Sequence, residues 1–186
     1  MKIIKDAKKS LTVDVDVRQK VFDILEDIRK NKDKALSEYC RKFDEYRGSI
    51  KITADVIKKA YDMVEKEVID DICFAAERIR KFAEIQKRSM AEVKEEVSPG
   101  VVLGHRIIPV QSCAAYIPGG RYPLPSSALM SIIPAKVAGV SRVVACSPPD
   151  KDAGTINPAT LIAMDIAGAD EIYCMGGAHA IGALAF

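Results

Sequence analysis

Residues 113–117 read Cys-Ala-Ala-Tyr-Ile, residues 142–146 read Arg-Val-Val-Ala-Cys, and residues 171–175 read Glu-Ile-Tyr-Cys-Met. Each of these short apolar runs predicts a buried strand. A helical pattern lies between each pair of runs, and each helix is expected to end at a glycine, Gly139 or Gly168. Strands and helices that alternate at this spacing predict a parallel sheet with right-handed crossovers, the doubly wound α/β class.

The chain before these strands has a different composition. Residues 1–98 contain 1 of the 11 glycines, none of the 9 prolines, 23 of the 28 Lys and Arg, and 21 of the 26 Asp and Glu. This contrast predicts a boundary near Pro99-Gly100, between a helical region at 1–98 and an α/β region at 99–186. A short hairpin of residues 101–103 and 106–110 is expected to open the second region. Four helices are expected in the first, with apolar positions from Val17 to Ile28, Leu36 to Phe43, Val56 to Val64 and Ile72 to Ala83.

Charge and composition exclude several classes of protein. The 186 residues are 48% apolar and carry a formal charge of +2, so the chain has enough apolar residues for a core and no strong field for nucleic acid or anionic membranes. No apolar run approaches the roughly 18 residues of a membrane span. Five cysteines, an odd number without a CxxC pair, are typical of reduced thiols. We therefore expect a cytosolic protein with neither a nucleic-acid nor a membrane partner.

Two loops follow the carboxyl ends of predicted strands, where ligands of open α/β sheets bind. Gly119 and Gly120 lie in the loop after Tyr116, and Gly176-Gly177 precedes the last helix. Paired glycines let a ligand approach the backbone, and a helix N-terminus favours an anion. Neither loop matches the GxGxxG dinucleotide motif, and Gly-Gly after a strand also simply makes a turn. The loops favour a nucleotide ligand without identifying it.

The two histidines, His105 and His179, do not predict a metal site. Zinc requires three or four ligands that converge on one point, and the positions of Cys and His offer no such cluster. His105 is expected to be a surface or packing residue, whereas His179, one turn into the last helix, is better placed to contact a ligand. No nucleophile with its base is recognisable. We therefore predict neither a metal ligand nor a catalytic residue in this chain.

Several blocks of sequence occur together in the order and spacing of a known family. The chain resembles the histidinol dehydrogenases over nearly its whole length. The blocks are residues 33–39, Phe43-Asp44, residues 76–82, 103–110, 115–120, 134–140, 146–149, 167–173 and 176–181.

The resemblance implies an α/β fold in which an N-terminal helical segment is followed by an incomplete, Rossmann-like parallel sheet with flanking helices. It also implies an intertwined homodimer that uses NAD and zinc to oxidise L-histidinol, through the aldehyde, to L-histidine. In the family a tyrosine matching Tyr116 contacts NAD, and so does a glutamine at the place of His179. The NAD-binding residues implied for this chain are Tyr116, Gly119, Gly120, Gly176, Gly177 and His179.

The family's zinc ligands and its Glu-His acid/base pair lie in the part of the polypeptide after the part that resembles this chain. We therefore expect Zn²⁺ to be a cofactor of the complete enzyme, with ligands outside this chain. The chain alone is expected to be inactive towards its small-molecule alcohol substrate. A missing C-terminal segment or a second polypeptide would then supply the remainder.

Other functions stay open. Residues 120–124 and 163–170 look closer to a paralogous branch that oxidises other small alcohols, such as dihydroxypropanesulfonate. A non-catalytic interaction module is a second alternative, which a large bare apolar surface would favour. An unrelated flavodoxin-like nucleotide-binding domain is a third, and it requires the ordered blocks to be a coincidence.

Overall fold

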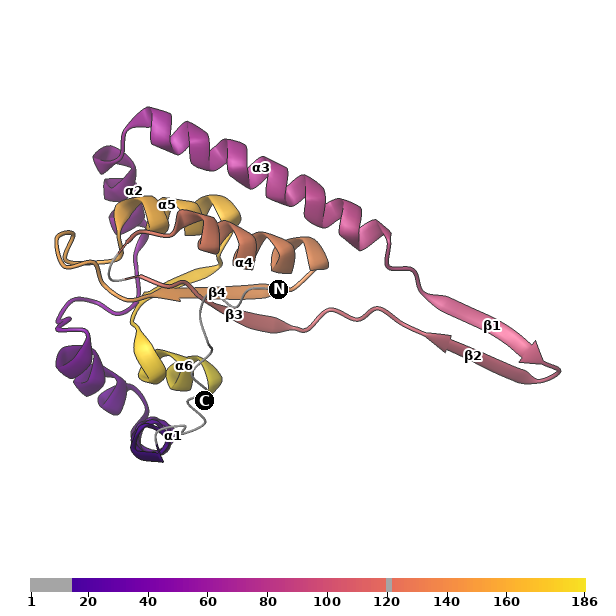
Figure 1. The fold of residues 1–186 in the computed structure, drawn as a ribbon, viewed down its shortest axis with the longest axis horizontal. Helices are drawn as coiled ribbons and strands as arrows, with labels where there is room; N and C mark the ends of the chain where they lie inside the picture. The colour runs from indigo at the N-terminus through magenta and orange to yellow at the C-terminus, as the bar shows by residue number, and fades with distance from the viewer. Residues whose placement is uncertain (1–14, 120–121) are drawn as a thin grey trace, which may run out of the picture.

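The computed structural model describes residues 15–119 and 122–186, which form a layered α/β body with one projecting hairpin (Figure 1). The elements follow in the order α1 (Val15–Phe43), α2 (Ala54–Met63), α3 (Lys66–Arg88), β1 (Val93–Ser98), β2 (Val101–His105), β3 (Ser112–Tyr116), α4 (Pro125–Ala138), β4 (Arg142–Ser147), α5 (Pro158–Ala167), β5 (Glu171–Cys174) and α6 (Gly177–Ala185).

The three predicted strands form a parallel sheet in the order β3-β4-β5. Their register pairs Tyr116 with Cys146, and Cys146 with Tyr173. Helices α4 and α5 cover one face of the sheet, with α2 and α3 outside them, and α1 and α6 cover the other (Figure 1). This arrangement confirms the predicted fold class, an α/β fold with an N-terminal helical segment and a short parallel sheet flanked by helices.

The helices of the α/β region begin and end where backbone preferences place them. Pro125 occupies the first turn of α4, and the side chain of Asn157 accepts hydrogen bonds at the start of α5. Gly139 and Gly168 follow the two helices with φ angles of 99° and 91°. This left-handed conformation is unfavourable for other residues, so the two glycines end the helices.

The helical region packs directly on the sheet layer. Its first two predicted helices form one helix, α1, with a kink at Lys32, where φ is 49°. Thr53 precedes α2, as predicted. Ile72 and Ala76 of α3 are buried in the same core as α4 and α5. Helices from both sides of Pro99-Gly100 pack into this one core. The predicted boundary between the two regions therefore stays a prediction.

The hairpin differs from the expected one. The predicted partners were residues 101–103 and 106–110, whereas β2 pairs antiparallel with β1, at Val93–Ser98. Gly100 makes the turn with a φ of 80°, and Pro109 has no N–H to donate to a ladder. The observed strands are exposed throughout, and His105 lies on this exposed hairpin, as expected for a surface residue.

Two further expectations concern the membrane and the cysteines. Within the described part of the chain, no helix combines the length and the apolar character that a bilayer span requires. All five cysteines are free thiols, as predicted.

Candidate functional site

The loop that contains Gly119 and the Gly176-Gly177 turn lie at the same edge of the sheet. Tyr116 ends β3 and Cys174 ends β5, and because the strands are parallel both following loops emerge at the carboxyl edge. A direct contact joins these loops, in which the backbone N–H of Gly177 donates a hydrogen bond to the hydroxyl of Tyr116 at 3.2 Å. The tertiary structure therefore brings together two candidate residues that are 61 positions apart.

The glycines of both loops lie close to the end of β4 and to the loop that follows it. A Cβ atom on Gly119 would lie 3.0 Å from Ser147 Oγ, and one on Gly176 would lie 2.7 Å from Pro148 Cβ. Gly177 has a φ of 60°, which favours glycine independently. Close packing accounts for Gly119 and Gly176, and backbone conformation accounts for Gly177, before any ligand is considered. Gly120 lies outside the described residues.

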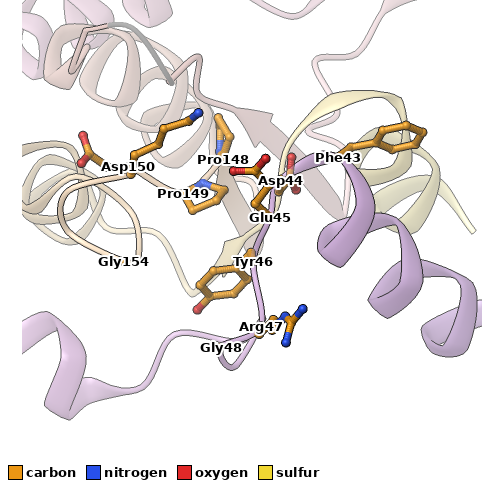
Figure 2. Close-up of a pocket in the computed structure, with 11 residues that line it drawn as sticks. Phe43, Asp44, Glu45, Tyr46, Arg47, Gly48, Pro148, Pro149, Asp150 and Gly154 are labelled. Carbon is orange, nitrogen blue, oxygen red and sulfur yellow. The ribbon is translucent and has the colours of Figure 1, made fainter.

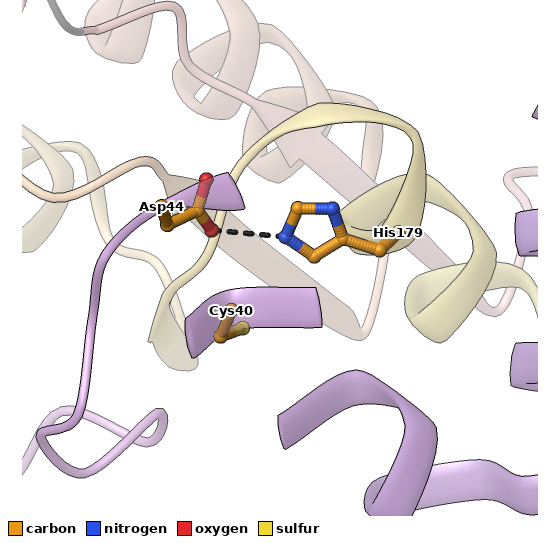
Figure 3. Close-up of side chains that lie close together, drawn as sticks. All are labelled: Cys40, Asp44 and His179. Carbon is orange, nitrogen blue, oxygen red and sulfur yellow. Dashed lines mark hydrogen bonds and ion pairs between the residues drawn. The ribbon is translucent and has the colours of Figure 1, made fainter. Parts of the chain in front are cut away.

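His179 is not at the surface of this edge. Its side chain is 2% exposed, and its Nε2 atom lies 2.9 Å from Oδ2 of Asp44, the residue that follows α1 (Figure 3). A carboxylate can only accept, so Nε2 carries the proton. The same Asp44 oxygen accepts a hydrogen bond from the N–H of Gly176 at 3.0 Å. The expected contact between His179 and a ligand is untested, and this burial opposes it.

Asp44 also places a negative charge at the N-terminus of α6, where it interacts favourably with the helix dipole. The carboxylate occupies the position at which an external anion would otherwise meet the first N–H groups of the helix. The anion at the Gly176-Gly177 turn is thus the carboxylate of Asp44 itself.

One group of possible metal ligands occurs among the described residues: Cys40, Asp44 and His179, whose donor atoms lie within 4.8 Å of one another (Figure 3). The sequence positions did not predict this cluster, because the three residues come from α1, the segment after it, and α6. Burial raises the pKa of the Cys40 thiol to about 12, and a metal requires the thiolate. Asp44 and His179 are already hydrogen-bonded to each other. As built, the cluster therefore fits a hydrogen-bonded core better than zinc, and the prediction of no metal site in this chain stays a prediction.

A cleft of about 450 Å³ opens beside this edge (Figure 2). It lies between the segment that follows α1 and the loop that follows β4, and its volume is within the range of small-molecule sites. Asp44, Arg47, Pro148 and Lys151 are among the residues that line it. Its charges are mixed, with two cationic side chains available to an anionic group.

The carboxylate of Asp150, at the same cleft, is used by its own loop. It accepts hydrogen bonds from the N–H groups of Ala153 and Asp152, which lower the pKa of Asp150 below its usual value. The side-chain amide of Asn157 adds a third contact at 3.4 Å. Asp150 therefore shapes the wall of the cleft.

Sequence reasoning missed the role of Asp44. Phe43-Asp44 appears among the blocks that carry the family resemblance, and this was the only available signal. Nothing in the local pattern shows that the carboxylate reaches Gly176, 132 positions away.

Comparisons with known proteins agree on one family. The family model for histidinol dehydrogenase matches residues 7–186. A histidinol dehydrogenase from Methanococcus maripaludis is 47% identical over 89% of this chain and 39% of its own length. A sulfopropanediol 3-dehydrogenase from Ruegeria pomeroyi is 42% identical over 92% of this chain and 39% of its own length.

A solved structure extends this likeness to three dimensions. The histidinol dehydrogenase from Elizabethkingia anophelis is 37% identical and superposes with a TM-score of 0.83, over 98% of this chain and 40% of that protein. The chain spans about two fifths of the length of these relatives. The sequence, the sheet topology and the extent of the match lead to one assignment: the chain belongs to the histidinol dehydrogenase family.

Proposed function

We propose that this chain is the NAD-binding part of a dehydrogenase that oxidises a small primary alcohol through the aldehyde to the acid. Membership of the histidinol dehydrogenase family supports an oxidoreductase. The observation that carries the cofactor proposal is the contact between Tyr116 and Gly177 at the carboxyl edge, beside a cleft of suitable size. Open α/β sheets bind nucleotides at this edge.

The residues at this edge fit a dinucleotide in their chemistry. The Tyr116 hydroxyl accepts from Gly177, so its own proton is free to be donated to a ligand. Arg47 and Lys151 at the cleft offer positive charge to phosphate groups. NAD, when bound, supplies the acceptor for the hydride that leaves the alcohol carbon. This chain's residues bind and orient the cofactor.

Zinc and the acid/base residues are proposed to lie outside this chain. The described residues hold one possible ligand cluster, Cys40, Asp44 and His179, and the protonated thiol does not fit zinc. Since the relatives are about two and a half times as long, the remaining three fifths of such a polypeptide would carry the reaction centre. We therefore propose that the chain alone has no turnover.

Two substrates remain as proposals. L-Histidinol is favoured by the relative from Methanococcus maripaludis and by the solved structure. A sulfonated propanediol is the second candidate, because a relative named for that activity is 42% identical. The two substrates differ in charge, an amino alcohol against a sulfonate, so substituting one for the other in assays of a complete enzyme separates them.

A partner for the chain is also proposed, either a second copy in a homodimer or a polypeptide that supplies the remainder. Its support is the apolar surface on β1, β2 and the segment before β3. Leu103, Ile108 and Val110 are 58%, 71% and 61% exposed. Exposed apolar residues in one region mark an interaction surface. We expect such an assembly in the cytosol.

Calorimetric titration of the purified chain with NAD tests the cofactor proposal. Saturable binding that disappears when Tyr116 is replaced by alanine is the expected result. Equal affinity of the wild type and the variant would remove Tyr116 from the site. A parallel assay with NAD, zinc and L-histidinol should yield no NADH, and measurable NADH would refute the proposed inactivity of the chain alone.

A further inference from the structure

We propose that Asp44 and His179 are positioning residues that hold the Gly176-Gly177 turn in place, and that His179 does not itself contact the cofactor. This inference rests on the proposed function as far as NAD is concerned. The resemblance to the family implied a ligand contact at this position, and the structure gives the side chain a different task.

The Asp44 carboxylate contacts two parts of the α6 start. One of its oxygens accepts hydrogen bonds from the N–H of Gly176, at 3.0 Å, and from Nε2 of His179, at 2.9 Å. The two donors lie on either side of the start of α6, and Asp44 follows α1. One carboxylate thus connects the end of α1 both to the Gly176-Gly177 turn and to the first turn of α6. Figure 3 shows the second of these contacts, between Asp44 and His179.

Both side chains of the pair are buried. His179 is 2% exposed and the Asp44 side chain 9%. The rings of Tyr39 and Phe43, both from α1, lie 6.1 and 5.9 Å from the imidazole ring. The imidazole is thus enclosed between α1 and α6, which pack against each other, and it offers almost no surface to a ligand.

The Gly176-Gly177 turn links the pair to Tyr116. Gly176 lies close to the loop after β4, since a methyl group on it would come within 2.7 Å of Pro148. Asp44 accepts from the N–H of Gly176, and the N–H of the next residue, Gly177, donates to the Tyr116 hydroxyl. Asp44 and His179 therefore act on the proposed cofactor contact indirectly, through the backbone of the turn.

Amide hydrogen exchange measured by NMR on the complete chain, without NAD, tests the positioning role directly. Asp44→Ala should raise the exchange rates of the Gly176 and Gly177 amides about tenfold or more, because a charged hydrogen-bond acceptor is lost. His179→Gln should stay within about twofold of the wild type, since its amide can donate to Asp44. His179→Ala should also raise the exchange rates of the Gly176 and Gly177 amides, because Asp44 loses one of its two hydrogen-bond donors. The matched control is Asp71→Asn, at an exposed acidic residue of α3, which should leave these exchange rates unchanged.

NAD titration of the same variants separates positioning from contact. We expect Asp44→Ala and His179→Ala to weaken NAD binding about five- to tenfold, in parallel with faster exchange at the turn, and His179→Gln to bind like the wild type. If Asp44→Ala does not fold, Asp44→Asn removes the same charge but keeps the shape of the side chain and one acceptor oxygen. Weaker NAD binding in His179→Ala with unchanged exchange at Gly176 would show direct contact and overturn the proposal, as would unchanged exchange in Asp44→Ala. If the wild type fails to bind NAD while Asp44→Ala still exchanges faster, the positioning role stands and the proposed function fails.

Discussion

The hydroxyl of Tyr116 and the backbone N–H of Gly177 form a 3.2 Å hydrogen bond between the loops of β3 and β5, two strands that are separated by β4. The bond crosses the whole width of the described sheet at its carboxyl edge. Tyr116 therefore contacts the Gly176-Gly177 turn as well as beginning the loop that follows β3. A change at either residue should therefore affect both loops.

Replacing Tyr116 by phenylalanine removes this acceptor and the proton available to a ligand. We expect the Kd for NAD to rise about 2- to 12-fold, which corresponds to the roughly 0.5–1.5 kcal/mol of an ordinary hydrogen bond. Calorimetric titration measures the change. Tyr61→Phe serves as the control, because its hydroxyl binds Asp165 between α2 and α5. If both variants bind NAD equally well, the hydroxyl of Tyr116 has no part in the site.

Two glycine variants should separate stability from binding. In Gly168→Ala the new Cβ has space, with the nearest atom at 3.9 Å, but the φ of 91° is unfavourable, so we expect a loss of about 1–2 kcal/mol in the free energy of unfolding. NAD affinity should stay unchanged in this variant. In Gly176→Ala the Cβ would collide with Pro148, which displaces the turn and weakens NAD binding as well. Urea unfolding and NAD titration measure the two effects, and normal NAD binding by Gly176→Ala would contradict the importance of the turn.

Glu171 at the opposite edge of the sheet should make stability depend on acid pH. Hydrogen bonds from Lys51, Tyr173 and Arg142 lower the pKa of Glu171 to about 2. Because the folded-state pKa is below the unfolded one, of about 4.3, this stabilisation is complete above that value and is lost as the pH falls towards 2.

The corresponding variant is Glu171→Gln. We expect it to unfold at a lower temperature than the wild type at pH 7, with a difference that narrows between pH 4.5 and 2. Thermal unfolding followed by circular dichroism measures this. Glu84→Gln, an exposed residue of α3, should behave like the wild type. A difference in unfolding temperature between the wild type and Glu171→Gln that stays constant down to pH 2 would contradict the role of Glu171.

Thiol reactivity should distinguish the buried cysteines from the accessible ones. Burial raises the pKa of Cys40, Cys146 and Cys174 to about 12, so their reactive thiolates are scarce at pH 8. Only Cys73, which is exposed, and Cys113, which is partly buried, should react quickly with a disulfide reagent. All five should react in denaturant. Three or more fast thiols in the native protein would show that the core opens.

Much of the α/β region could be predicted from local sequence. The strands at 113–117, 142–146 and 171–175 agree with β3, β4 and β5 within a residue or two, and Gly139 and Gly168 end their helices as expected. These features depend on the conformational preferences of single residues and on short apolar runs. The prediction paired the strand at 101–103 with residues 106–110, whereas its partner is β1. Both strands of the hairpin are exposed, so no alternation of buried and exposed residues specifies which strands pair.

The sequence by itself determined the alternating strands and helices of the α/β region, the glycines that end α4 and α5, and the family. Only the tertiary structure showed that Asp44 binds Gly176 and His179, and that His179 is buried where the resemblance implied a ligand contact. The physical reason is distance along the chain. Local preferences act over a few residues, whereas the partners of a buried carboxylate are chosen by the packing of segments more than 130 positions apart.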